Sequence, residues 1–534
     1  MPRAHPPGPA TPRFSWDPRY RPCIPAMSVD GATTHHSLCA LFEEAEQLST
    51  IHCATPGETV AVIEFLMAIC FASSTCPASP KEWRSWIEEE HDLRAASMWL
   101  RDQRADEWDL FHPETPLAQN GCPGFAGHLD ERGSGPAQLV IERAGDYSQH
   151  FDHRHLDHSE PLPAAEAFRA VMTQHVYAPY GRARMSGKGI GPKVTNLAAG
   201  RLTGRVRVVA LGRTLGETLR LNLYPPDGPG QPLNTSWTSG SIVRRGFKEK
   251  AKPRVPSSSA DLHSVLGRSI VLRPAEGPYG QIVVDRVLIG AGEVLDLDPT
   301  RHLQDAVFSE RNPDKPLWPS PTRALWRDAH ALYSAVRDAR AGLYERLHSL
   351  KRRQKAAGIP YQLWAVGLIT NKSLAVAWTQ GSYPYAPAME RHLYRASRRG
   401  SEVAEYVAES LRRAAVVAAE NIYPAAFASD QGADLSSFDA RWEFWPTAEQ
   451  PFHQLLEQVA KAGLVDDDDP VSEPLVAYAE TLVISARSQL ARRLDTLPPN
   501  NKGYRARARA EQRFEDDMES PKAPAEIRGE SAHD

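Results

Sequence analysis

The stretch "PYGRARMSGKGIGPKVTNLAAGRLTGRVRVVALG" at residues 179–212 and its continuation "SIVRRGFKEKAKPRV" at 241–255 are the segment around which this chain is organised. Between Pro179 and Pro256 there are fifteen Lys or Arg residues and three acidic ones, in a chain whose net charge is -4. Such an excess of positive charge among glycines is typical of a segment that binds a polyanion along its backbone. The alternative is a solvated loop whose basic composition has no function.

Composition limits what the rest of the chain can be. Its 534 residues suffice for two or three domains, and its 41% hydrophobic and 24% charged content is typical of a soluble globular protein. Because the net charge is near zero, any binding of nucleic acid must be local. The N-terminus lacks an apolar signal segment and no window is long enough to span a membrane, so we expect a cytoplasmic protein with no membrane partner.

The six cysteines all lie in the first quarter of the chain and none forms a CxxC pair, so neither a zinc site nor another cofactor is predicted. The thirteen-residue apolar run Val60–Ala72 contains Glu64 and predicts a buried helix. Thr55 is its predicted N-cap, followed by Pro56 at the first helical position and by Glu58 three residues after the cap.

Hydrophobic periodicity predicts an α+β fold, with a large mixed α/β domain over 14–384 followed by an antiparallel four-helix bundle over 385–497. The bundle prediction depends on amphipathic segments at Ser401–Asn421, Thr447–Leu464 and Ser472–Leu494. Composition predicts that the two ends of the chain, residues 1–13 and 498–534, are disordered.

Within the α/β domain the pattern predicts short strands over Phe14–Cys53 and β-structure over Ser264–Leu297, where β-branched runs alternate with glycines. A long helix is predicted from Thr322 to Ala356, because apolar residues recur there at helical spacing. Residues Tyr361–Gln380 are predicted to form two strands joined by a turn at Thr370-Asn371-Lys372.

The segment "HFDHRHLDH" has the composition of an active site. Imidazoles and carboxylates at this density could hold a divalent metal that activates water, so a metal-dependent nuclease is the alternative function. Nothing in the pattern provides a template for the ligands or a second, substrate-orienting cluster, which favours a solvated or partner-contacting loop. The residues concerned are His150, Asp152, His153, His155, Asp157 and His158.

"GKGIG" at Gly187–Gly191 does not match GxxxxGK[ST], and no GxSxG motif is present, so neither nucleotide hydrolysis nor serine catalysis is indicated. Glycines beside Lys188 still allow the backbone to approach a phosphate or a groove closely.

The order of several motifs resembles a known family, the CasA-type large subunit of the type I-E CRISPR surveillance complex Cascade. The similarity extends over most of the chain, from Phe14 to Leu494. Its motifs are "FSWDPRYRPCIP", "LFHPETPLAQ", "QHFDHRHLDHSEPLPAAEAFRAVM", "GRTLGETLRLNLY", "DPTRHLQDAVF", "LWPSPTRALWRD" and "EFWPTAEQPFHQLL".

The resemblance implies a subunit that is not an enzyme. In that family the large subunit reads the protospacer-adjacent motif (PAM) of double-stranded target DNA, helps the guide RNA to open the duplex, and recruits the CRISPR helicase-nuclease. Its implied partners are therefore the CRISPR RNA (crRNA), the other Cascade subunits, target DNA and that helicase-nuclease. This agrees with RNA-guided recognition in general, where base pairing reads sequence and protein reads the PAM.

The resemblance also implies positions for the DNA-contacting elements. The glycine loop that faces the PAM minor groove falls at Gly181 or at Gly187-Lys188-Gly189, and the nearest basic residue for the lysine finger is Arg286. The wedge at a hairpin tip falls at Asn371 and Lys372, where the family has glutamine, and the glycine loop lacks a run of consecutive glycines.

A further loop, which in the family contacts the crRNA end and the neighbouring backbone subunit, falls at Ser148, Gln149, His150 and Phe151, with Phe151 as its apolar anchor.

Overall fold

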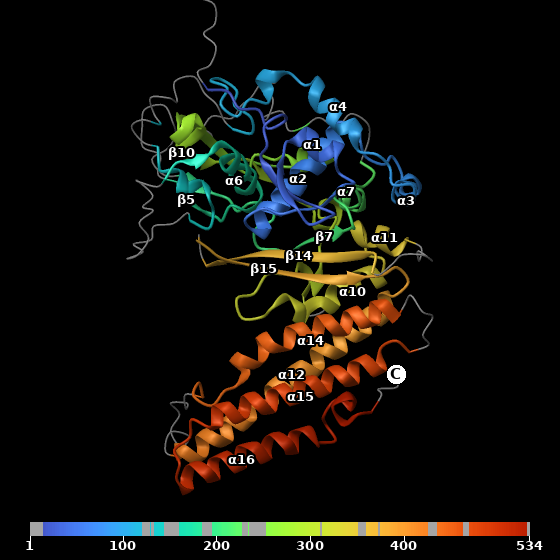
Figure 1. Cartoon of the computed structure of the whole chain (residues 1–534), viewed down its shortest axis with the longest axis vertical. Helices are drawn as coiled ribbons and strands as arrows, with labels where there is room; N and C mark the ends of the chain where they lie inside the picture. Colours follow the sequence, from blue (N-terminus) through green and yellow to red (C-terminus); the bar gives the residue numbers. More distant parts are fainter. Residues whose placement is uncertain are drawn as a thin grey trace, which may run out of the picture. The chain divides into compact units, whose positions relative to one another are not determined.

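In the computed structural model the chain divides into two compact units (Figure 1). The first comprises Met1–Thr322, Ala341–Arg346 and Trp364–Gly381, and the second Arg323–Arg340, Leu347–Leu363 and Ser382–Asp534. The second unit thus includes two segments that lie N-terminal to the predicted boundary at 384/385. The residues described by the structure are 14–119, 129, 133–143, 160–183, 195–226, 233, 252–309, 312–350, 359–371, 374–424, 435–462 and 469–530.

The helices of the first unit are α1 (Leu38–Glu43), α2 (Pro56–Ala72), α3 (Pro80–Glu88), α4 (Arg94–Asp102), α6 (Ala164–Tyr177), α7 (Leu215–Asn222), α8 (Ser259–His263) and α9 (Pro299–His302), with 3-10 turns η1 (Ala105–Glu107), η2 (Pro136–Leu139) and η3 (Pro278–Gly280). Its strands are β1 (Ile24–Ser28), β2 (Thr33–His36), β3 (Leu48–Ile51), β4 (Leu162–Pro163), β5 (Gly181–Ala183), β6 (Thr195–Leu197), β7 (Arg207–Leu211), β8 (Pro253–Arg254), β9 (Arg268–Glu276), β10 (Ile282–Ala291), β11 (Val294–Leu295), β12 (Phe308–Ser309) and β13 (Asn312–Pro316).

Most of the hairpin of β14 (Tyr361–Asn371) and β15 (Leu374–Tyr385) belongs to the first unit, and α11 (Leu343–His348) begins there. The second unit contains η4 (Leu325–Asp328), α10 (Ala329–Arg337), α12 (Glu390–Ile422), α14 (Arg441–Ala462), α15 (Ser472–Leu494), α16 (Asn501–Met518) and η5 (Ala525–Arg528).

Small sheets provide the β-structure. The sheet orders are β2-β1-β3, β4-β10-β9 and β15-β14-β7, with two-stranded pairs β5-β6, β11-β8 and β12-β13. In the β9–β10 hairpin the register shifts between Val284 and Arg286, which is a bulge around Asp285. The predicted strands over Phe14–Cys53 and in the 264–297 region are confirmed, as are the two strands of the predicted hairpin. The turn predicted at Thr370-Asn371-Lys372 is displaced, because Thr370 and Asn371 still belong to β14, and β15 extends beyond Gln380 to Tyr385.

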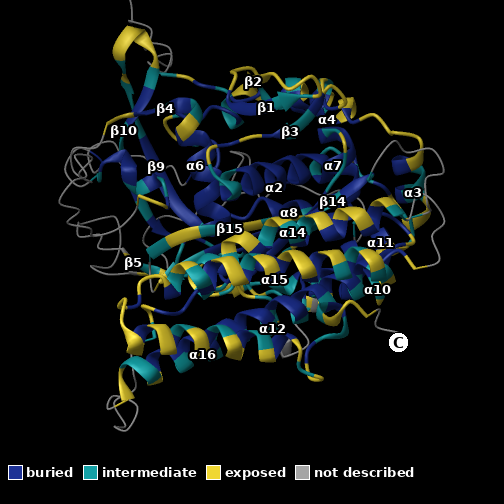
Figure 2. Ribbon diagram, turned by 60° about the horizontal axis from the view of Figure 1, so that its bottom comes forward, coloured by how far each residue is buried: buried dark blue, intermediate teal, exposed yellow. Residues whose placement is uncertain are grey.

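Helix α2 is the centre of the first unit. Thr55 Oγ1 accepts a hydrogen bond from Glu58 N, and a Glu58 carboxylate oxygen accepts one from Ala54 N, so a reciprocal N-terminal cap forms as predicted. Beyond this first turn almost every residue is buried, Glu64 included (Figure 2). Helices α6, α7, α8 and α4 contact α2, which explains why it carries apolar residues on all sides.

The predicted long helix over Thr322–Ala356 is wrong. The chain forms the shorter elements η4, α10 and α11, and it turns sharply at Ala339 and Gly342, where φ is +46° and +82°. A left-handed conformation interrupts a helix, and helical spacing of apolar residues does not reveal it.

The second unit is built on α12, which contacts α10, α14, α15 and α16. Its buried face is rich in small residues, including Gly400, Ala404 and Ala408. A Cβ on Gly400 would lie 3.0 Å from Leu455, so α14 approaches α12 closely at this glycine. The predicted fold class, a mixed α/β part followed by C-terminal helices, is confirmed.

The prediction of a disordered tail after Pro498 is wrong for the described part of that tail. Asn500 caps helix α16 by accepting hydrogen bonds from the backbone N–H groups of Lys502 and Gly503. The helix buries an i, i+4 stripe against α12 that consists of Ala506, Ala510, Phe514 and Met518. This narrow stripe is sufficient for packing although the helix is polar overall.

We therefore predict that Phe514→Ala lowers the free energy of unfolding by about 3–5 kcal/mol, since the Phe514 side chain is 1% exposed and its removal leaves a cavity. Tyr504→Ala, on the same helix at 62% exposure, serves as the control and should change stability by less than about 0.5 kcal/mol. Urea titration of both variants measures the difference. Equal losses would show that α16 does not pack as described.

Candidate nucleic-acid interface

The strands β5 and β6 form the base of the basic stretch. They pair antiparallel with Gly181 opposite Leu197, and residues 184–194 connect them. Tyr180 and Arg182 are exposed at this base, and β10 contacts both strands. The local structure thus presents the ends of a basic, glycine-rich loop on the edge of a stable hairpin.

A buried arginine holds both ends of this small hairpin. Arg268, the first residue of β9, is 2% exposed, and its guanidinium donates to the carbonyl oxygens of Pro179, Ala198 and Gly267. Pro179 lies just before β5 and Ala198 just after β6. Burial lowers the pKa of Arg268 to about 10, so the side chain remains charged at neutral pH and its hydrogen bonds are charge-assisted.

Two glycines allow the backbones around this anchor to approach one another. A Cβ on Gly267 would lie 2.2 Å from His175 O, and a Cβ on Gly200 would lie 2.4 Å from Val176 O. Neither contact tolerates a side chain. The C-terminal end of α6, the start of β9 and the segment after β6 therefore form one rigid base.

Among the basic residues between Pro179 and Pro256 that the structure describes, five face inward. All five form ion pairs with carboxylates, and four of them are buried, so the charge count from composition overestimates what is available to a polyanion. Arg201 pairs with Glu64, Arg205 with Asp305, and Arg207 with both of these carboxylates. Arg220 pairs with Glu46, and Arg254 with Asp261 and Glu293.

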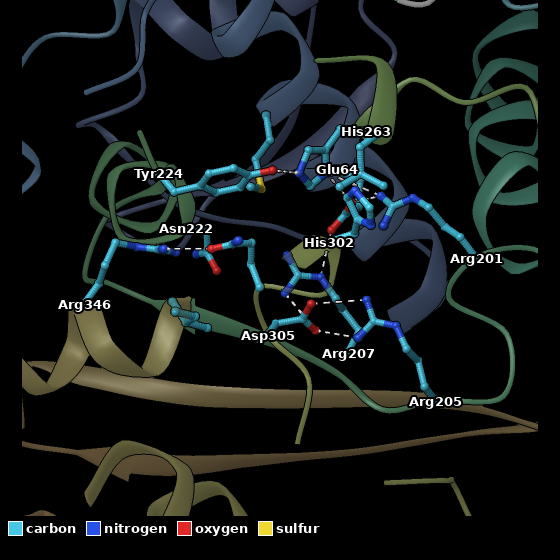
Figure 3. A pocket seen from close by; sticks show the side chains of 14 residues that line it. Glu64, Arg201, Arg205, Arg207, Asn222, Tyr224, His263, His302, Asp305 and Arg346 are labelled. Atoms are coloured by element: carbon cyan, nitrogen blue, oxygen red, sulfur yellow. Dashed lines mark hydrogen bonds and ion pairs between the residues drawn. The ribbon is translucent and has the colours of Figure 1, made fainter. Parts of the chain in front are cut away.

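Glu64 is the first centre of this ion-pair network (Figure 3). Its carboxylate accepts from Arg201, from Arg207 Nε at 2.7 Å and from His263 Nδ1 at 2.6 Å. Burial, together with Arg201 and Arg207, lowers the pKa of His263 well below its usual value. A neutral imidazole that donates from Nδ1 can accept from Tyr224 Oη at Nε2, 3.3 Å away.

Asp305 is the second centre. It accepts from Arg205 Nη1 at 2.8 Å, Arg205 Nη2 at 3.1 Å and the backbone N–H of Val208 at 3.0 Å, and it lies 3.1 Å from Arg207 Nη1. Although burial would raise it, the pKa of Asp305 is held well below its usual range by Arg205 and Arg207. The network fixes the chain from Arg201 to Val208, which leads from β6 into β7.

Trp378 fixes the β14–β15 hairpin within the first unit. A Cβ on Gly57 would lie only 1.9 Å from the indole ring of Trp378, so the ring fits there because residue 57 is glycine. The indole Nε1 donates a hydrogen bond to Glu142 at 2.7 Å. The indole ring packs edge-to-face on Tyr177, with centroids 4.8 Å apart. Tyr177 lies four residues before Gly181, so the hairpin is attached next to the base of the basic loop.

The structure describes three of the predicted DNA-contacting residues, and two of them lie on strands that contact each other. Gly181 begins β5, Arg286 lies on β10, which contacts β5, and Asn371 is exposed at the end of β14. Arg286 is half-buried opposite Arg273, and its Cβ is 3.1 Å from the position that a Cβ on Gly133 would take. This packing restricts how far the Arg286 side chain can reach.

The remaining predicted positions lie outside the described residues. They are Gly187, Lys188, Gly189 and Lys372 of the DNA-contacting set, and Ser148, Gln149, His150 and Phe151 of the crRNA-facing loop, together with the rest of the histidine cluster up to His158. Within the described ranges, no group of three or more His, Cys, Asp or Glu side chains is arranged to hold a metal ion.

Comparison with known proteins decides the family. The model of the CRISPR-associated protein Cse1 family matches residues 20–518. The chain belongs to the Cse1 family. This confirms the resemblance to the CasA-type large subunit of type I-E systems.

Known relatives of the Cse1 family show how far the similarity extends. A Thermus thermophilus protein described as CRISPR-associated protein CasA/Cse1 is 26% identical over 206 residues, which is 38% of either chain. The matched part thus spans well under half of that relative. Solved structures share the fold over nearly the whole chain. The Thermobifida fusca Cse1 structure gives a TM-score of 0.73 at 20% identity and covers 96% of this chain and 98% of its own.

Two further structures extend the comparison. Cse1 from Acidimicrobium ferrooxidans gives a TM-score of 0.71 at 20% identity, with 98% of this chain and 100% of that chain covered. A chain from a structure titled CRISPR RNA-guided surveillance complex gives 0.66 at 20% identity, with 94% and 99% covered. Among the described residues of the present chain, no helix has the length and apolar character to cross a membrane.

Sequence reasoning missed the residues that support the base of the β5–β6 hairpin. Arg268 looked like one more residue of a strand, because nothing local distinguishes a buried arginine from an exposed one. Glu64 did give a signal, since a lone carboxylate in a buried apolar helix requires a partner. The sequence did not show that its partners would be Arg201 and Arg207, which lie more than 130 residues away.

If Arg268 anchors the hairpin, Arg268→Met should open it. Three backbone carbonyls lose a charged donor, so the population of the open form of the β5–β6 hairpin should rise at least about tenfold. Trypsin cleavage after Arg182, which lies within β5, should accelerate by the same factor while the far-UV spectrum is retained.

The matched control is Arg273→Met on the same strand, where the arginine pairs with Asp285 at 2.6 Å and is 30% exposed. Its cleavage rate should equal that of the wild type. Similar acceleration in both variants would mean that the hairpin is not held by Arg268.

Proposed function

We propose that this Cse1-family chain is the large subunit of a type I-E Cascade complex and that it reads the PAM of double-stranded target DNA. The observation that supports this most is the rigid base under the basic loop, with Arg268 tying both strands of the hairpin to the core. Such a base is what a protein needs to present a short glycine-rich loop to one site on a duplex.

When the five ion-paired arginines are left out, most of the positive charge between Pro179 and Pro256 lies in two segments. Of the ten other basic residues, Arg213 lies 3.8 Å from Glu217, and the remaining nine cluster in 182–193 and 244–252. They are Arg182, Arg184, Lys188, Lys193, Arg244, Arg245, Lys248, Lys250 and Lys252, with Glu249 as the sole acidic residue inside either segment. These two short arms supply salt-dependent affinity for phosphates.

Specificity in this proposal comes from access to the groove. Gly181 or Gly187-Lys188-Gly189 approaches the minor groove, Arg286 contributes a nearby positive charge, and Asn371 with Lys372 acts as the wedge that helps the duplex to open. Because the minor groove distinguishes A·T from G·C but little more, we expect more than one PAM to be accepted. The guide RNA reads the rest of the target.

The partners follow from the same proposal. Ser148, Gln149, His150 and Phe151 contact the crRNA end and the neighbouring backbone subunit, and the chain recruits the CRISPR helicase-nuclease once the duplex is open. The subunit itself needs no cofactor and has no catalytic role. Its contribution to antiviral defence is recognition.

Two substitutions separate affinity from duplex opening. In the assembled complex, Lys188→Ala should weaken binding to a PAM-containing duplex and reduce the slope of log K against log salt by about one, since one phosphate contact is lost. Asn371→Ala should weaken binding by about 5- to 150-fold without changing that slope, because asparagine is uncharged. Binding is measured by filter retention at several salt concentrations.

Lys81→Ala, at an exposed position of α3, is the matched control and should bind as the wild type does. Equal affinity of the wild-type complex for PAM and scrambled duplexes would refute the proposal. The alternative nuclease is tested in parallel with Mn²⁺ and labelled DNA or RNA. We expect no cleavage, whereas cleavage lost on His150→Ala, His153→Ala or His158→Ala would favour the alternative.

A further inference from the structure

The tip of the β9–β10 hairpin carries an aromatic residue in an unusual conformation. Tyr279, in turn η3, has φ +65° and ψ +22°, and Gly280 N donates to Gly277 O at 3.3 Å, which closes a four-residue turn around it. Turns with a positive φ at this third position normally have Gly or Asn there, because a larger side chain is strained in the left-handed conformation. Among the six described non-glycine residues with a positive φ, Tyr279 is the bulkiest and the only aromatic one.

The fold makes no use of the Tyr279 ring. The side chain is fully exposed, and within the described part of the chain it makes no hydrogen bond or ring contact. Figure 2 shows the exposed tip of this hairpin beyond the buried part of β10. The turn closes through the backbone, because Gly277 N donates to Gln281 O at 2.8 Å and Glu276 pairs with Ile282. A strained aromatic side chain with no packing role in its own chain points to a contact with another molecule.

The register of the hairpin separates this tip from the base of the basic loop. Arg268, which anchors that base, pairs with Ala291 at one end of the hairpin, and Glu276 pairs with Ile282 at the other. The eight residue steps from Arg268 to Glu276 correspond to about 26 Å of extended strand. The tip therefore lies at the opposite end of the hairpin from the anchor of the proposed DNA site.

The chemistry of the tip differs from that of the basic stretch. The sequence "PAEGPYGQIVV" from Pro274 to Val284 contains one charged residue, Glu276, which is exposed. A tip with one negative charge and no Lys or Arg is poorly suited to a phosphate backbone. A rigidly held tyrosine suits a protein partner, because tyrosine buries a large amphipathic ring at a small cost in side-chain entropy.

We propose that this hairpin tip docks into another protein subunit of the assembled complex. The Tyr279 ring enters an apolar pocket that offers a hydrogen-bond partner to the hydroxyl group, and a basic side chain at the rim of the pocket faces Glu276. The inference rests on the proposed function only in that the partner belongs to the same complex. Because the turn holds the ring in place before binding, little further order is lost on docking.

The first test separates docking from folding. Tyr279→Asn removes the ring but places there a residue that tolerates the left-handed conformation. In the free chain the thermal midpoint should not fall, and relief of the strained φ should raise it by about 1–2 °C. A drop of several degrees would show that the ring packs within its own chain, which overturns the proposal.

The second test measures docking itself, as the affinity of the chain for a complex assembled from crRNA and the other subunits without it, in the absence of DNA. Tyr279→Asn should bind at least about 30-fold more weakly than the wild type. Tyr504→Ala, at an exposed position of α16, is the control and should bind as the wild type does. Equal affinities of Tyr279→Asn and wild type overturn this proposal alone, whereas a wild-type chain that does not bind the complex overturns the proposed function with it.

Two further measurements test the chemistry of the partner. Glu276→Lys should weaken subunit binding by about 3- to 10-fold, and more at low salt, because it places a positive charge against the basic rim. Unchanged or tighter binding contradicts such a rim. In a complex saturated with the Tyr279→Asn chain, the affinity for a PAM-containing duplex should equal that of the wild type. Weaker DNA binding with unchanged subunit affinity would identify Tyr279 as a DNA contact and overturn the proposal.

Discussion

A single carboxylate inside the most buried helix of the first unit determines much of the surrounding structure. Glu64 is 1% exposed on α2 and must be paired, because an isolated charge in such a position would be too costly to bury. Its partners Arg201 and Arg207 belong to the segment that leaves the basic hairpin, so satisfying Glu64 also fixes where that hairpin ends. Asp305 and Arg205 extend the same constraint to the start of β7.

A second buried charge, on Arg268, also holds the β5–β6 hairpin. Arg268 is buried at the start of β9 and its hydrogen bonds all go to backbone carbonyls named above, including those that flank β5 and β6. Charge thus has two roles in one stretch of sequence. Buried arginines build the support, and we propose that the arginines and lysines of segments 182–193 and 244–252 bind the polyanion. Such a division of charge is what the proposed recognition of one site on a duplex requires, as opposed to general coating of nucleic acid.

Local signals were enough for much of the fold. The cap at Thr55, the apolar run of α2 and the alternation in β9 and β10 all predict their elements, because each is decided by neighbouring residues. Long-range pairing could not be predicted in this way. Arg205 meets Asp305 across 100 residues, so its charge was counted as accessible although it is buried. Helix α16 was missed because two of the four residues in its buried stripe are alanines and the rest of the helix is polar. The break at Gly342 was missed because it depends on φ.

For the site, the resemblance pointed to Gly181, Arg286 and Asn371, and the structure brings the strands of Gly181 and Arg286 into contact. The resemblance could not identify Arg268, whose role exists only in the folded chain. The central claim is that the base formed by β5 and β6 faces the PAM. It is tested most directly by photo-cross-linking in the assembled complex, with a photo-reactive phenylalanine analogue in place of Tyr180, which is 51% exposed beside β5, or of Tyr504 on α16 as the reference. We predict that the probe at 180 cross-links to nucleotides of the PAM and that the probe at 504 does not. Cross-links from 180 spread evenly along the duplex, or none at all, would contradict this account.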